Sequence, residues 1–206
     1  MKKILIILLS ISFAGISLAD FNDGADAAQK GDFKTAFKEW SSLAEQGDAE
    51  AQASLGLLYF YGDGVNQSHK KAIYWYEKSA NQGDSSGQFN LGFMYDRGFG
   101  TSINKKKATN LYTKSAEQGN ASAQSNLGML YLFDSNFKKA LYWLNKSADQ
   151  DYAEAEYLLG YAYFHGYGVK QSNKKAFKWF TKAAKQGNIL AESMVAYMYD
   201  EGIGVK

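Results

Sequence analysis

The sequence predicts an all-α protein, an α-solenoid of stacked two-helix units, on three observations. A glutamine followed by glycine recurs in steps of 36, 36, 32 and 36 residues, at Gln46, Gln82, Gln118, Gln150 (where Asp151 replaces the glycine) and Gln186. A Leu-Gly pair keeps the same phase, at Leu55, Leu91, Leu127, Leu159 and, weakened to Val-Ala, Val195. A tyrosine follows each of these by four residues, at Tyr59, Tyr95, Tyr131, Tyr163 and Tyr199. Repetition at this period favours a solenoid, because one unit cannot bury its apolar face without a neighbour.

Residues 1–19 have the pattern of a signal peptide. Lys2 and Lys3 precede an apolar stretch, and Leu18 stands between small residues, Ser17 and Ala19, of the kind that signal peptidases read. The stretch is shorter than the roughly 20 residues that span a bilayer. We therefore expect cleavage after Ala19, export to the periplasm or the medium, and no membrane span in the mature chain.

The remaining residues, 20–206, are expected to form one solenoid domain. Its repeats cover approximately 20–47, 48–83, 84–119, 120–151 and 152–187, followed by a half repeat, 188–206. In the second unit the predicted helices run from Asp48 to Tyr61 and from Ser68 to Gln82. Apolar residues recur there every three to four positions, which places them on one helical face.

Capping residues and glycines mark the helix boundaries. The second helix of each unit follows a residue that caps helix N-termini well, at Asp32, Ser68, Asn104, Asn136 and Ser172. The glycine of each Gln-Gly pair is suited to end a helix in the left-handed conformation. A Gly-x-Gly loop joins the paired helices in most units, whereas the fourth unit lacks it, which explains its 32-residue step.

Composition excludes several classes of function. The chain has no cysteine, so it forms no disulfide, thiolate metal site or cysteine nucleophile. Lys2 and Lys3 account for the whole net charge of +2, which leaves the mature chain formally neutral and offers no general electrostatic basis for binding nucleic acid.

The repeat resembles the Sel-one-like repeat (SLR) family, relatives of the tetratricopeptide repeat (TPR). The best-preserved copy runs from Ala51 to Gly83. It follows the pattern Ala-x-x-Leu-Gly-x-x-Tyr, then Gly-x-Gly-Val, then Lys-Lys-Ala-x-x-Trp-x-x-Lys-Ser-Ala-x-Gln-Gly. The resemblance covers residues 21–206 and implies a right-handed superhelix. It also implies an adaptor or scaffold, since members are mostly proteins that hold complexes together, many of them exported by bacteria.

Similarity to tetratricopeptide repeats places the first helix of each unit on the concave surface. The exposed positions of those helices carry mostly apolar and aromatic residues: Leu57, Phe60, Phe89, Phe93, Met129, Leu132, Tyr157, Tyr161, Phe164 and Tyr197. Such a groove would bind an extended or helical peptide through rigid aromatic anchors. The alternative is that many of these rings pack against the next repeat.

Two further features leave alternatives open. A lysine column recurs at the start of each second helix, at Lys34, Lys70, Lys71, Lys106, Lys107, Lys138, Lys139, Lys174 and Lys175. It would either bind an acidic partner or form a solvated edge paired with nearby carboxylates. The last helix, Asn188 to Glu201, is apolar on more than one face, so it either packs back on the fold or offers an edge for a homodimer or a partner.

No pattern indicates catalysis, a metal or a cofactor. His69 and His165 occupy different repeat positions and are expected to be surface or cap residues, and no serine has a triad context. The expected function is therefore an exported scaffold, not an enzyme, that binds a protein or peptide and no nucleic acid. The alternatives are a cell-envelope component that binds peptidoglycan or another anionic polymer, and a weak penicillin-binding, β-lactam-hydrolysing relative.

Overall fold

The computed structural model describes residues 20–205, and every regular element in that range is an α-helix. The predicted signal peptide lies outside the described residues. The helices are α1 (Phe21–Gln29), α2 (Phe33–Glu45), α3 (Ala49–Tyr61), α4 (His69–Asn81), α5 (Ser85–Arg97), α6 (Lys105–Glu117), α7 (Ala121–Phe133), α8 (Phe137–Ala148), α9 (Ala153–His165), α10 (Asn173–Ala184) and α11 (Ile189–Asp200).

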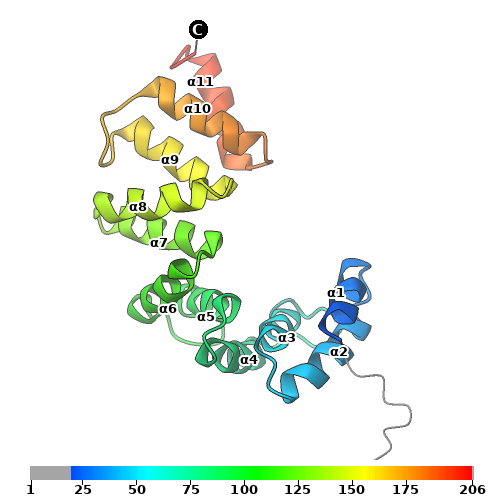
Figure 1. Cartoon of the computed structure of the whole chain (residues 1–206). Helices are drawn as coiled ribbons and strands as arrows, with labels where there is room; N and C mark the ends of the chain where they lie inside the picture. The colour runs from blue at the N-terminus through cyan, green and yellow to red at the C-terminus, as the bar shows by residue number, and fades with distance from the viewer. Residues whose placement is uncertain (1–19, 206) are drawn as a thin grey trace, which may run out of the picture.

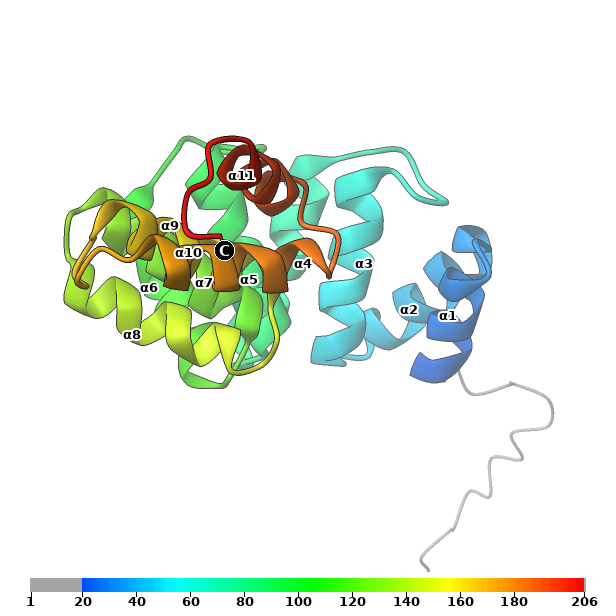
Figure 2. The ribbon, with the colours of Figure 1, turned by 90° about the horizontal axis from the view of Figure 1, so that it is seen from above.

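The helices stack in chain order into a curved solenoid. Each packs mainly on its two sequence neighbours, so that α1 and α11 lie at opposite ends of the curve (Figure 1). In the view turned by 90°, α10 and α11 overlie the middle of the stack rather than α1 and α2 (Figure 2). The predicted α-solenoid is confirmed.

The odd-numbered helices line the inner side of the curve. Besides its sequence neighbours, α3 contacts α5 and α7 contacts α9. In Figure 1, α5 lies on the inner side of the bend and α6 on its outer side. The first helix of each unit is therefore in the position that similarity to tetratricopeptide repeats implies.

Side-chain caps start the helices where the sequence predicts them. The side chains of Asp32, Ser68, Asn104, Asn136 and Ser172 each accept a hydrogen bond from a backbone N–H of the first turn. The glycines of the Gln-Gly pairs have positive φ, for example +101° at Gly47, which ends the preceding helix. Asp151, which replaces one of these glycines, also has a positive φ of 58°.

In each of the first five units, a glycine of the inner helix receives a large side chain of the outer helix. We call this contact the glycine socket. A Cβ added to Gly24, Gly56, Gly92, Gly128 or Gly160 would lie between 2.5 and 3.0 Å from a large side chain of the following even-numbered helix. Those side chains are Trp40, Tyr76, Tyr112, Leu144 and Phe180. The repeat glycine is therefore required for close helix packing, and Ala196 in α11 has no such socket.

Glutamine links join successive units. The side-chain amide of Gln82 donates to the carbonyl oxygen of Gly47 (2.9 Å) and to the side-chain oxygen of Gln52 (2.8 Å), and Gln118 and Gln150 repeat the arrangement. Gln52 in turn donates to the buried carbonyl of Ala44. These links satisfy buried polar groups and fix the register of neighbouring units.

Candidate functional site

Two hollows open on the inner side of the solenoid. The smaller, about 190 Å³, lies between α3 and α5, and we call it the α3–α5 hollow. The larger, about 450 Å³, is the α7–α9 hollow. Together they contain eight of the ten residues that the sequence predicts for partner binding: Leu57, Phe60, Phe89 and Phe93 in the first, Met129, Leu132, Tyr157 and Tyr161 in the second.

The two hollows have the same design, two units apart. Residues that occupy equivalent repeat positions line both: Leu57 and Met129, Phe60 and Leu132, Tyr61 and Phe133, Phe89 and Tyr157, Asn90 and Leu158, Phe93 and Tyr161. Each hollow therefore combines the end of one inner helix with the middle of the next inner helix.

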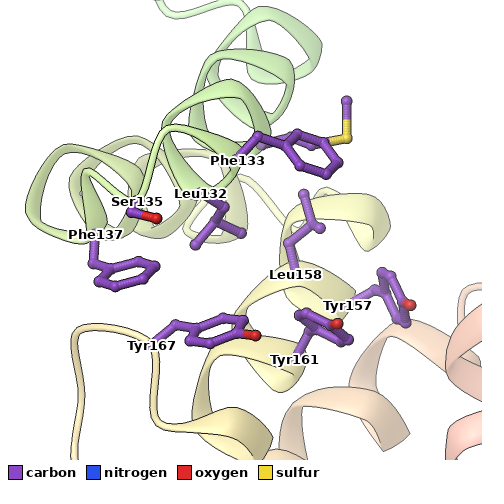
Figure 3. A pocket seen from close by; sticks show the side chains of 9 residues that line it. Leu132, Phe133, Ser135, Phe137, Tyr157, Leu158, Tyr161 and Tyr167 are labelled. Atoms are coloured by element: carbon purple, nitrogen blue, oxygen red, sulfur yellow. The ribbon is translucent and has the colours of Figure 1, made fainter.

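Aromatic residues from the Gly-x-Gly loops and from the starts of outer helices complete these surfaces. Phe99 contacts Phe60, with 5.4 Å between ring centroids, and also packs on His69 and Phe93. In the α7–α9 hollow Tyr167 stacks on the ring of Phe137 at 5.2 Å (Figure 3). These ring contacts restrict the positions of the lining side chains.

A short turn after α7 distinguishes the second hollow from the first. Only Asp134, Ser135 and Asn136 separate α7 from α8. Phe133 is 79% exposed beside the hollow. In Figure 3 the side chains of α7 face those of α9 and Tyr167 across an open space.

A group of polar residues separates the two hollows, and we call it the polar step. At the equivalent positions between α5 and α7 stand Asp96, Arg97, Ser125 and Asn126. Asp96 is buried and pairs with Lys105 at 2.8 Å and with Arg97 at 3.3 Å. The apolar inner surface thus consists of two separate hollows, whereas the sequence predicts a single groove.

The other two predicted residues lie elsewhere. Phe164 packs mainly on the core around Phe180, and Tyr197 is exposed on α11. The eight residues in the hollows are half-buried apart from Leu57, which is exposed. Burial raises the pKa of Tyr157, with a smaller contribution from Glu154, so its hydroxyl is a neutral donor at physiological pH.

The lysine column covers the repeat tyrosines. The amino groups of Lys71, Lys107, Lys139 and Lys175 lie 4.7–5.2 Å from the ring centroids of Tyr59, Tyr95, Tyr131 and Tyr163. Among the described residues no carboxylate lies within ion-pair distance of any lysine of the column. The expectation of carboxylate pairing was therefore wrong, and cation–π contacts take its place.

A buried carboxylate interrupts the series of glutamine links. Glu156 occupies the position of Gln52, Gln88 and Gln124, and it is fully buried. Its two carboxylate oxygens lie 2.7 Å from Lys182 Nζ and 2.8 Å from the side-chain amide of Gln186. Asp151 also pairs with Lys182. The carboxylates of Asp151 and Glu156 raise the pKa of the Lys182 amino group.

The two hollows are recessed apolar surfaces. Within residues 20–205 no group of three or more histidine, aspartate or glutamate side chains is placed to hold a metal ion. His69 and His165 lie among aromatic rings at the edges of the two hollows. None of the described helices is both long and apolar enough to cross a membrane.

A stacked series of two-helix units with glycine sockets defines a helical-repeat protein. A family model described as Sel1 repeat matches residues 49–84, 85–120, 121–152, 153–188 and 189–206. The chain therefore belongs to the Sel1 repeat family, whose members are generally scaffolds for protein interactions. The resemblance inferred from the sequence is confirmed.

Solved structures support this assignment. A protective antigen of uropathogenic Escherichia coli with an SLR fold is 39% identical over 88% of this chain (TM-score 0.82), and this chain covers 41% of its length. A Sel1 repeat protein from Oxalobacter formigenes is 31% identical over 89% of this chain and 74% of its own (TM-score 0.80). An immunity protein from Pseudomonas aeruginosa is 26% identical over 83% of this chain and 66% of its own (TM-score 0.59). No curated protein matches the chain.

Proposed function

We propose that the protein is an exported, non-catalytic scaffold that binds a polypeptide partner in the two hollows on its inner surface. The observation that carries the proposal is the recurrence of the same apolar hollow two units apart, at equivalent repeat positions. A repeated pair of hollows suits a chain that runs along the solenoid and places one apolar anchor in each.

The lining residues have the properties of binding anchors. Rings such as Phe93 and Tyr161 are half-buried, so a partner would cover their remaining surface without a large loss of side-chain entropy. The polar step at Asp96 and Arg97 lies between the hollows, which favours a partner segment that is apolar at its two ends and polar between them. Tyrosine hydroxyls at Tyr157 and Tyr161 add hydrogen-bonding groups to the larger hollow.

Export follows from the pattern of residues 1–19. We infer that the mature chain begins at Asp20 and acts in the periplasm or outside the cell. N-terminal sequencing of the protein recovered from the envelope or the medium of the native organism tests this. A mature protein that retains residues 1–19, or that stays in the cytoplasm, contradicts it.

Photo-crosslinking in the native organism tests partner binding. A photoreactive amino acid replaces Phe93 or Tyr161 in the full chain, and the control replaces Tyr142, which is exposed on α8 outside both hollows. We expect the same polypeptide to be linked at positions 93 and 161 and to be absent at position 142. Equal labelling at position 142, or no polypeptide at either hollow, contradicts the proposal.

A further inference from the structure

The helix α10 is the most basic in the solenoid. It carries Lys174, Lys175, Lys178 and Lys182, Lys185 follows at its C-cap, and no acidic residue occurs between Asn173 and Asn188. The position of Lys185 is occupied in the other units by Glu45, Asn81, Glu117 and Asp149. This repeat position is therefore positively charged only in the unit of α10, whereas in the other units it is acidic or neutral.

These lysines surround a hollow between α10 and α11, which we call the basic hollow. Its volume is about 890 Å³, and its lining combines Phe177, Tyr199 and Val205 with the five lysines. The rings of Phe177 and Tyr199 meet edge to face, with centroids 5.1 Å apart. The hydroxyl oxygen of Thr181, another lining residue, is buried and has no hydrogen-bond partner among the described residues.

Most of the positive charge here is unpaired. Lys182 is held by Asp151 and Glu156, but within the described part of the chain no carboxylate lies within 4.0 Å of Lys174, Lys178 or Lys185. The acidic residues of the adjoining α11, Glu192 and Asp200, form no ion pair with them either. The basic hollow therefore presents ammonium groups around an apolar floor.

The position of this hollow is suited to a helix. In the preceding units the tyrosine equivalent to Tyr199 lies beneath a lysine of the next outer helix, as Tyr59 does beneath Lys71. Tyr59 is 9% exposed, whereas Tyr199, which no later helix covers among the described residues, is 61% exposed. In the earlier units the helix that covers this tyrosine is the next outer helix, so the surface around Tyr199 has the form that receives a helix.

We propose that the basic hollow binds an acidic amphipathic helix of a partner polypeptide. Carboxylates on one side of the helix pair with Lys174, Lys178 and Lys185, while apolar residues on its other side cover Phe177 and Tyr199. Charge complementarity and an apolar floor together select this occupant over a purely polar chain. The basic hollow shares no residue with the two inner hollows. A test of this inference is therefore independent of a test of the proposed function.

Binding of a designed peptide to the mature chain tests the inference. The probe is a fluorescently labelled amphipathic helix with glutamates on one face and leucines and alanines on the other, followed by fluorescence anisotropy. We expect saturable one-to-one binding that weakens as salt rises. The combined variant Lys178→Glu and Lys185→Glu should lower the affinity roughly tenfold through loss of two ion pairs and added repulsion.

A matched control separates this site from general attraction by lysines. Lys38 occupies the position of Lys178 in the first unit, and its side chain is 83% exposed. Lys38→Glu should leave the affinity unchanged, and circular dichroism should show both variants folded. An equal loss in Lys38→Glu, no binding of the probe, or equal binding of a proline-interrupted version overturns the proposal. Inorganic polyphosphate or anionic vesicles that bind the basic hollow while the peptide does not would also overturn it.

Discussion

The ring of Tyr76 lies against the backbone of Gly56, so closely that a Cβ at position 56 would be 2.6 Å from the ring carbons Cδ1 and Cε1. Tyr76 comes from the outer helix of the unit and Gly56 from its inner helix, and both are buried. This contact sets how near α3 and α4 approach each other. It recurs in each of the first five units, where the large side chain is tryptophan, tyrosine, leucine or phenylalanine.

Gly56→Ala should destabilise the protein. Overpacking against a fixed ring costs about 1–3 kcal/mol, which exceeds the gain of about 1 kcal/mol from replacing glycine by alanine in a helix. Gly92→Ala is the matched control, because its Cβ would meet Tyr112 at 3.0 Å and the ring needs to move less. Urea unfolding should show the larger loss for Gly56→Ala; equal losses would contradict the account.

The buried carboxylate of Glu156 predicts an unequal response to substitution. Glu156→Gln restores the glutamine of the other units and keeps a partner for Gln186, so its free energy of unfolding should stay within about 1 kcal/mol of wild type. Lys182→Met removes the cation and leaves the carboxylate buried; because Lys182 is 43% exposed and solvent screens the pair, the cost should be about 1–3 kcal/mol. If the two variants unfold at the same denaturant concentration, the carboxylate is not held as described.

The contact between Lys107 and Tyr95, 4.7 Å from amino group to ring centroid, contributes a small stabilisation. Lys107→Gln should lower the free energy of unfolding by about 0.5–1 kcal/mol. Lys106→Gln, a change of the same chemistry at the adjacent exposed position, should have no measurable effect. A cation–π role for the column would be refuted if both lysines proved equally dispensable.

Alkaline pH should weaken the fold through Tyr76. Burial raises the pKa of this fully buried tyrosine well above its ordinary value near 10. The protonated hydroxyl of Tyr76 therefore contributes fully to the free energy of unfolding below the pKa of the unfolded state. That contribution is lost as the pH rises toward the pKa of the folded state. Between about pH 10 and 11.5, urea unfolding of wild type should lose stability more steeply than Tyr76→Phe, by about 1.4 kcal/mol per pH unit. Parallel pH profiles would show that the hydroxyl reaches water in the folded state.

Much of this architecture could be predicted from the sequence because its causes are local. The phase of Leu55 and Tyr59, the capping residue Asp48 and the glycine at position 47 each act within one or two turns. The eight residues of the inner hollows follow from the same phase, since helical periodicity fixes which positions face inward.

Contacts between helices were not visible in the same way. The polar step at Asp96 occupies the repeat position of Phe60 and Leu132, but its burial and ion pairs depend on the packing of α5 and α6. The covering of Tyr95 by Lys107 depends on how α6 crosses α5, although the recurring spacing between the two residue types would have indicated it. The link between Glu156 and Lys182 joins α9 to α10 within one unit, and no local pattern reveals it.

Binding of one polypeptide by both inner hollows is tested by isothermal titration calorimetry of the crosslinked partner against mature wild type and against Phe93→Ala combined with Tyr161→Ala. Truncating one anchor in each hollow should lower the affinity by roughly a hundredfold or more, while circular dichroism stays unchanged. Unchanged affinity in a folded double variant would contradict binding by both hollows.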